Sequence, residues 1–259
     1  IRDRPSWVLQ AYALQNVVSW LLFAWWLHRR LPSADLKSLL VWAGCLFSHG
    51  LLISTRLALL DGPSVLLCVL AVSAVERSRP LVAAAVAGVS GLARETNLLT
   101  ALAVPGPWPP SGRQALRYAG RVCLVVAPLL LWTDYLRSIY RSAALAGSGD
   151  LLNVPLAAYL RCWKMSWLGV LTYGAHAPQW AGVLALTAVT VQAGFLAARI
   201  RWRNPWWRVA VGYVVMMLLL HGSVWEGNPG AFTRVLLPMQ IAFNPVSYTH
   251  LRAHETGRN

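Results

Sequence analysis

LVAAAVAGVSGLARETNLLTALAV, from Leu81 to Val104, is the stretch that decides the fold of this chain. Its only charged residues are Arg94 and Glu95, which stand side by side near its middle in a mostly apolar run. A charged side chain at membrane depth costs about 2.5 to 3.5 kcal/mol on insertion scales, so such residues usually have a buried partner or a function. The stretch therefore raises two linked questions: whether it forms one helix or two, and what the two charges contact.

The composition of the whole chain places this stretch in a membrane protein. Of the 259 residues, 57% are hydrophobic and 12% are charged, against roughly 25% charged in an ordinary soluble domain. Long uncharged runs recur along the chain, and a membrane-spanning helix needs about 20 such residues. The expected fold class is therefore all-α, a polytopic transmembrane helical bundle with short broken helices and an interfacial helix.

The net charge of +14 is better explained by the membrane than by nucleic acid. Basic residues gather in short connections between apolar runs, such as ERSRP (76–80) and RIRWRNPWWR (199–208). Lys and Arg in such connections mark the cytoplasmic side of a membrane protein. We therefore expect the lipid bilayer as a partner, and no nucleic acid.

This charge pattern also orients the predicted helices. The run from Trp7 to Leu27 ends in three basic residues, so its C-terminal end is expected in the cytoplasm. Further spans are predicted over residues 39–54, 63–75, 122–133, 180–200, 206–224 and 232–243. A helix at the membrane interface is predicted over 154–168, with one apolar face formed by Leu156, Leu160, Trp163 and Trp167.

The rule that basic residues mark the cytoplasmic side also applies to the stretch from Leu81 to Val104. One continuous helix would put the basic segment GRQALRYAGR (112–121) outside the cell, against the rule. A broken pair instead rises from Leu81 to Ala93, turns at Arg94-Glu95 and returns over 96–104. Non-helical backbone at membrane depth is allowed where protein covers it. The broken pair is favoured because each half is too short to span alone.

Cysteine and histidine spacing does not predict a metal centre. The cysteines are isolated and show no CxxC pair, and four of the histidines are equally scattered: Cys45, Cys68, Cys123, Cys162, His28, His49, His176 and His221. No cofactor is identified, and a divalent metal is not indicated by the sequence.

The ends of the chain carry separate expectations. Ile1 is not an initiator methionine, so we expect an upstream segment. SYTHLRAHETGRN (247–259) resembles translated adaptor or vector sequence. Residues 245–259 are therefore expected to be a non-native tail, and residues 1–244 a single transmembrane domain truncated at both ends.

On this topology, charged residues from different helices converge on the outer membrane boundary. Arginine offers a planar fork of donors that suits phosphate, and a carboxylate suits a sugar hydroxyl or a general base. A lipid-linked sugar phosphate offers both groups, a phosphate for arginine and sugar hydroxyls for a carboxylate. The candidate substrate-binding residues are Arg56, Arg94 and Arg234, and the candidate catalytic carboxylates are Asp61, Glu95 and Glu226.

Each candidate also has a structural interpretation. Arg94 and Glu95 can form a salt bridge that caps two half-helices. Asp61, two residues before a proline, can cap the following helix. Glu226 can be a solvated loop residue, and Arg234 can extend to the interface.

Four segments together resemble a known group of proteins. They are DGPSVLL (61–67), ERSRP (76–80), GLARETNLL (91–99) and VWEGNPGAFTRVLLP (224–238). This pattern resembles bacterial polytopic proteins implicated in forming cell-surface glycopolymers, which in turn resemble the GT-C integral membrane glycosyltransferases.

The resemblance implies an enzyme of the bacterial inner membrane with its site on the extracytoplasmic face. It implies a polyprenyl-phosphate sugar donor and a glycan acceptor, and a catalytic acid in a loop upstream of Ile1. Arg94, Glu95, Glu226 and Arg234 would then position donor or acceptor. Two alternatives stay open: a glycolipid transporter or flippase, which also uses broken helices, and a non-catalytic scaffold of glycan assembly.

Overall fold

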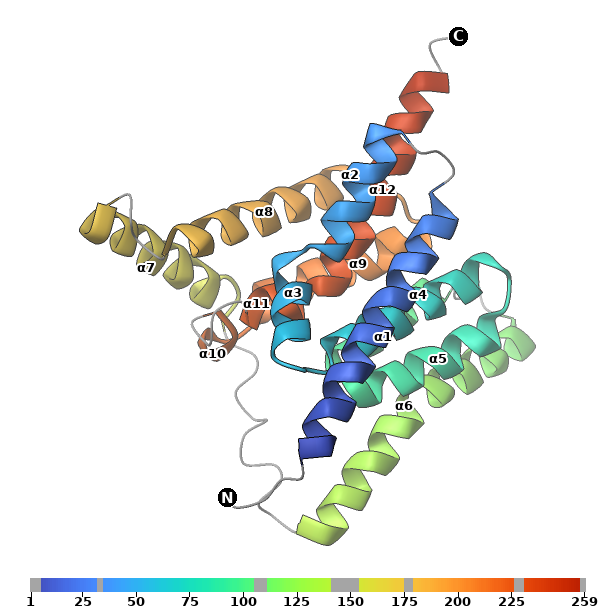
Figure 1. Cartoon of the computed structure of the whole chain (residues 1–259). Coiled ribbons are helices and arrows are strands. Elements are labelled where there is room, and N and C mark those ends of the chain that lie inside the picture. Colours follow the sequence, from blue (N-terminus) through green and yellow to red (C-terminus); the bar gives the residue numbers. More distant parts are fainter. Residues whose placement is uncertain are drawn as a thin grey trace.

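The computed structural model describes residues 6–31, 35–104, 111–140, 154–174, 179–225 and 231–256. Every regular element assigned in these ranges is a helix (Figure 1). In chain order they are α1 (Ser6–Arg30), α2 (Leu36–Leu46), α3 (His49–Arg56), α4 (Asp61–Glu76), α5 (Pro80–Ala93), the 3-10 helix η1 (Glu95–Ala103), α6 (Gly112–Tyr140), α7 (Ala157–Tyr173), α8 (Gln179–Ala198), α9 (Pro205–Leu219), α10 (Gly222–Trp225), α11 (Ala231–Val235) and α12 (Leu237–Thr256).

The described residues confirm the predicted all-α class. Several of their helices also have the length and composition of membrane spans. Among the described residues, α1, α6 and α8 each qualify alone, and α2 with α3 qualifies as a fourth span bent by 44°. Many of their large apolar side chains face outward, for example Leu130 and Leu131 of α6 at 62% and 70% exposure. An outward apolar surface of this kind suits contact with lipid.

Helix α4 lies at the centre of the bundle and packs against α1, α5, α9 and η1. Its sequence is apolar on every side, as expected for a helix with neighbours all round. Trp26 of α1 anchors one side by donating from Nε1 to Ser73 Oγ at 3.1 Å. On the other side, Tyr213 of α9 is fully buried in the same core. This central position puts the first residue of α4, Asp61, inside protein.

The stretch from Leu81 to Val104 is a broken pair, and the continuous-helix alternative is wrong. Helix α5 ends at Ala93, and Arg94 has extended backbone with φ −160° and ψ 123°. The 3-10 helix η1 then runs back along α5, so that Val104 packs with Ala83 near the start of α5. Asn97 fixes the return by donating from Nδ2 to the Ser90 carbonyl at 3.1 Å.

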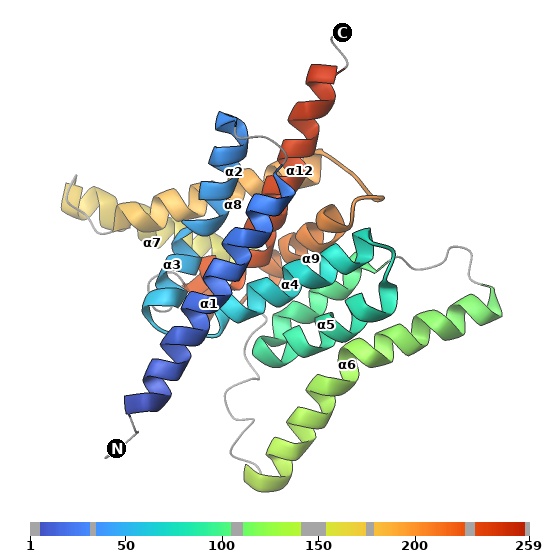
Figure 2. The same cartoon turned by 45° about the vertical axis from the view of Figure 1, so that its right-hand side comes forward.

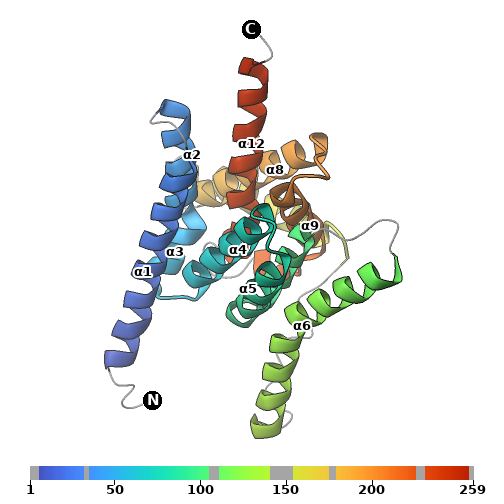
Figure 3. The ribbon, with the colours of Figure 1, turned by 90° about the vertical axis from the view of Figure 1, so that its right-hand side faces the viewer.

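Helix α6 is longer than predicted and lies at the edge of the bundle. It includes the basic segment 112–121 and reaches Tyr140, whereas the prediction was 122–133. Pro128 stands inside it, and Figure 2 shows the helix bent, with both arms leaving the bundle. It crosses α5 closely, because a Cβ on Gly88 would lie 2.5 Å from the Leu124 carbonyl oxygen. In Figure 3, α6 lies at the edge of the bundle.

Two helix ends use the same stop signal without glycine. After α3, Ala58 has φ 51°, and after α4, Ser78 has φ 57°. The Ser78 N–H donates to the Val75 carbonyl and the Arg79 N–H to the Ala74 carbonyl, both at 2.9 Å. These bonds form a Schellman motif. The predicted tight basic turn at 76–80 is therefore confirmed.

Other predicted helix bounds need correction. The span expected over 39–54 is split into α2 and α3, and the one over 206–224 into α9 and α10. In α7, the buried residues are Ala158, Cys162 and Val170, while Leu160 and Trp167 of the predicted apolar face are exposed. The interfacial location of this helix stays a prediction.

Helix α12 continues past Pro245 to Thr256, across the predicted boundary of the non-native tail. Val246 is fully buried in the main core. A helix can extend into any sequence that tolerates helical backbone, so the origin of residues 245–259 stays a prediction. In Figures 1 and 3, α1 begins at the opposite end of the molecule from the end of α12.

Candidate functional site

Asp61, the first residue of α4, faces other helices instead of capping its own. The turn after α3 brings the chain to this point, and Ser54 Oγ donates to the Leu59 carbonyl at 3.3 Å. The helix cap position is taken by Leu60, and no side chain bonds to the first N–H groups of α4. The predicted capping role of Asp61 is therefore wrong. Its side chain is 8% exposed and contacts two arginines.

Arg94 is the first of these arginines. Its backbone N–H completes α5 by donating to the Ser90 carbonyl at 3.1 Å, and its extended conformation turns the chain into η1. Its Nη1 donates to Asp61 Oδ1. The predicted salt bridge between Arg94 and Glu95 is therefore replaced by an ion pair with a residue of α4.

Arg234 of α11 is the second arginine. Its Nη1 lies 3.5 Å from Asp61 Oδ2. Helix α11 is held close to α3 at Gly50, where a Cβ would lie 2.7 Å from the Thr233 carbonyl oxygen and 3.0 Å from the Arg234 nitrogen. Only a glycine permits this approach. The packing of α3 on α11 thus determines where Arg234 lies.

Together Asp61, Arg94 and Arg234 form what we call the anion cluster. One carboxylate faces two guanidinium groups, which leaves one positive charge in excess. Arg94 and Arg234 keep 24% and 18% of their side chains exposed. Asp61 Oδ2 and Arg234 Nε are buried and have no hydrogen bond within the described protein. Buried polar atoms are normally satisfied, so the Arg234 donor invites a further acceptor, whereas Asp61 Oδ2 already lies against Arg234 Nη1.

The other sequence candidates lie outside this cluster. Arg56, the last residue of α3, is exposed, and Glu95 is exposed at the start of η1. Neither forms an ion pair within the described ranges. Glu226 lies outside the described residues. The structure thus brings together three of the six candidates, from α4, the α5–η1 break and α11.

A buried polar network lies behind the anion cluster and was not predicted. Asn97 Nδ2 donates to Ser64 Oγ at 2.6 Å, and Tyr213 donates to Asn97 Oδ1 at 3.1 Å and to the Thr96 carbonyl at 3.0 Å. These bonds tie η1 to α4 and to α9. The network stabilises the return segment that follows Arg94.

The opposite end of α4 carries a separate polar group. Arg30 of α1 donates to Glu76, and Trp206 Nε1 donates to the same carboxylate at 2.8 Å. Arg208 donates to the carbonyls of Leu102 and Ala103, so it caps the C-terminal end of η1. These contacts join the ends of α1, α4, α9 and η1.

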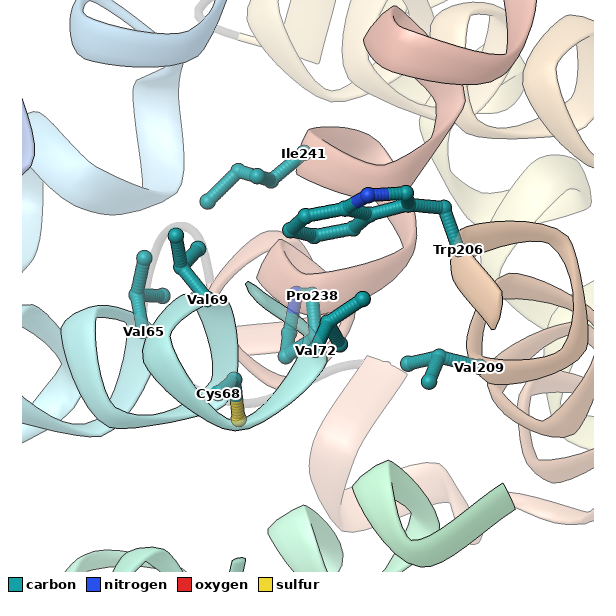
Figure 4. A pocket seen from close by; sticks show the side chains of 8 residues that line it. All are labelled: Val65, Cys68, Val69, Val72, Trp206, Val209, Pro238 and Ile241. Carbon is teal, nitrogen blue, oxygen red and sulfur yellow. The ribbon is translucent and has the colours of Figure 1, made fainter. Parts of the chain in front are cut away.

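A small cavity between α4, α9 and α12 is not a ligand site. Its volume is about 10 Å³, which is at most the space for one water. Figure 4 shows the indole of Trp206 and the side chains of Val69, Val72, Pro238 and Ile241 around this cavity. The lining offers a water no set of polar partners, so the cavity is a packing void.

The described residues contain no group of three or more His, Cys, Asp or Glu side chains that could hold a metal ion. The anion cluster itself, with one carboxylate and two cations, does not suit a cation. A role for a divalent metal stays untested.

Comparisons with protein-family models, curated proteins and solved structures find no match to this chain. The described residues therefore define only a class of protein: their regular elements are helices, and three of these could cross a membrane, or four if α2 and α3 form one span.

Proposed function

We propose that this chain is part of a GT-C-like glycosyltransferase of the bacterial inner membrane, which uses a polyprenyl-phosphate-linked sugar to build a cell-surface glycan. The observation that carries the proposal is the anion cluster. Two arginines from distant parts of the chain meet one buried carboxylate at one end of the bundle, with one positive charge in excess. The resemblance of GLARETNLL and VWEGNPGAFTRVLLP to that group of proteins supports it.

The donor phosphate is the ligand that the anion cluster suits. Arginine binds phosphate through parallel N–H donors, and each such charge-assisted bond is about twice as strong as a neutral one. Arg234 Nε is a buried donor that has no acceptor among the residues that the structure describes. Asp61 would act as a positioning residue that holds both guanidinium groups, while the prenyl chain stays in lipid.

The transfer would proceed by displacement at the anomeric carbon. The acceptor hydroxyl oxygen attacks that carbon, the bond to the phosphate oxygen breaks, and polyprenyl phosphate leaves with the electron pair. The arginines stabilise the charge on the leaving phosphate. A carboxylate takes the hydroxyl proton.

Glu95 is the described carboxylate best placed for that proton. It is exposed and adjacent in sequence to Arg94, whereas Asp61 is buried against two arginines. Glu226 is the second candidate, and the resemblance implies a third upstream of Ile1. Glu95→Gln and Glu226→Gln therefore separate these alternatives: the true base loses kcat with little change in the donor KM.

The deciding experiment measures sugar transfer from a polyprenyl-phosphate donor by the purified full-length protein. We expect Arg94→Gln and Arg234→Gln to raise the donor KM about tenfold or more, since each removes a charged donor worth about 1.5 to 3 kcal/mol. Arg137→Gln, which removes an exposed charge of α6, is the matched control. Normal transfer in both cluster variants would contradict the site assignment. No transfer by the native protein would contradict the proposal that it is a glycosyltransferase.

A glycolipid transporter is the second candidate, and the break at Arg94 is the observation that favours it. Transporters build their sites from discontinuous helices whose ends face the substrate. Such a protein would move a fluorescent lipid-linked sugar across a vesicle membrane without transferring the sugar. A scaffold would do neither.

A further inference from the structure

A second basic site lies between the α4–α5 turn and the N-terminal half of α6. An open cavity of about 710 Å³ is lined there by Arg79, Pro80, Leu81, Val82, Arg117 and Arg121. It lies at the first residues of α5, whereas Arg94 follows the last one, about 20 Å away along the helix. The cavity is therefore distinct from the anion cluster. Its volume is in the range of small-molecule sites, about 300 to 1,000 Å³.

The local structure explains why three arginines meet here. The Schellman motif at Ser78 turns the chain so that Arg79 directly precedes α5, and Pro80 occupies the first position of that helix. On α6, Arg117 and Arg121 are four residues apart and therefore share one face. The close crossing at Gly88 holds α6 beside α5.

The charges of this cavity are not balanced by protein. Its lining has no carboxylate. The nearest acid in the sequence, Glu76, already accepts from Arg30 and Trp206. Arg121 Nε is buried and has no hydrogen-bond partner in the described part of the chain. Like charges four residues apart on a helix repel each other, so an anion between them would stabilise the site.

The rest of the lining is apolar and exposed. Leu81 and Val82 keep 64% and 50% of their surface accessible. A ligand that matches both features has an anionic head and an apolar chain. We propose that this cavity binds the phosphate group of an anionic phospholipid, with the phosphate between Arg79, Arg117 and Arg121 and an acyl chain over Leu81 and Val82. Basic pockets between membrane helices are suited to such head groups.

The phosphate chemistry could also come from a soluble phosphate, and the test separates the two sources. The purified protein is stripped of lipid, and its thermal unfolding is followed with added phosphatidylglycerol, phosphatidylcholine or inorganic phosphate. We expect phosphatidylglycerol to raise Tm and the other two additives to have little effect. The double variant Arg117→Gln/Arg121→Gln should need about tenfold more phosphatidylglycerol for the same shift.

The matched control is Arg113→Gln/Arg137→Gln, which removes two charges from the same helix outside the cavity. It should respond like the native protein. If the Gln pair does not fold, Arg117→Lys/Arg121→Lys keeps both charges but loses the forked donors, and it should bind more weakly than the control. An equal response of all variants overturns the proposal. A shift from inorganic phosphate through the same arginines retains the phosphate site but overturns the lipid assignment.

Discussion

Arg94 donates a hydrogen bond to the carboxylate of Asp61, although the two residues are 33 positions apart in the chain. The bond joins the first turn of α4 to the break between α5 and η1. Arg234 then adds a third element to the same carboxylate. A charge that looks misplaced in an apolar run is thus one side of a buried ion pair.

Removing the shared carboxylate should destabilise the protein strongly. Asp61→Ala leaves two arginines without a counter-charge, and breaking a buried pair in this way costs about 3 to 5 kcal/mol. The change should appear as a lower Tm of the purified protein in detergent. Asp134→Ala, which removes an exposed carboxylate of α6, should have an effect within about 0.5 kcal/mol. Equal stability of the two variants would contradict the structural role of Asp61.

The close contact of α3 with α11 predicts a sharp difference between two glycines. In Gly50→Ala the new Cβ meets the backbone of Thr233 and Arg234, and overpacking of this kind costs about 1 to 3 kcal/mol. Gly194→Ala in α8 meets nothing within 4 Å, so its better helix propensity should raise Tm slightly. Thermal unfolding of both variants tests the difference, and a harmless Gly50→Ala would argue against the close crossing.

The left-handed residue after α4 predicts a stabilising substitution. Ser78 has φ 57°, a conformation that glycine adopts without steric cost. Ser78→Gly should therefore gain about 0.5 to 1 kcal/mol. The same change at Ser138, inside α6, should cost about 0.5 kcal/mol. Opposite shifts of Tm are expected, and a loss of stability in both would show that the Schellman turn is absent.

The predicted orientation can be tested at two equivalent positions. Leu57 and Arg77 are the residues that cap the C-terminal ends of α3 and α4, and the proposed topology puts them on opposite sides of the membrane. In a background without the exposed Cys123, Leu57→Cys should react with an impermeant maleimide in intact spheroplasts. Arg77→Cys should react only after permeabilisation. The reverse pattern would place the anion cluster on the cytoplasmic side.

Much of the fold follows from local chemistry that the sequence displays. The break at Arg94, the turn at 76–80 and the positions of the long apolar helices could all be predicted, because charge, proline and hydrophobic length act locally. The bent pair α2–α3 could not, since its bend depends on how α3 packs against α11 at Gly50. The extent of α6 was missed because its polar N-terminal segment reads equally well as a loop.

The residues of the candidate site were predicted from the sequence, but the ion pairs between them were not. Arg94, Arg234 and Asp61 stood out as charges in apolar surroundings, which is a single-sequence signal. Which of them touch depends on contacts between distant helices. The network around Asn97 was missed for a different reason. Asn97, Thr100 and Ala103 are the buried residues of η1, and their spacing of three matches the 3-10 helix. On an α-helix the same three residues would spread over about 120°, so the single row that they form is a feature of the 3-10 helix.

The 3-10 form of η1 also decides how far the chain reaches. Nine residues at about 2.0 Å each extend about 18 Å, whereas the same nine in an α-helix would extend only about 13.5 Å. Helix α5, with 14 residues, is about 21 Å long. The nine residues of η1 therefore extend nearly as far as α5, the helix along which they return. A shorter η1 would leave its last carbonyls, those of Leu102 and Ala103, beyond the reach of Arg208.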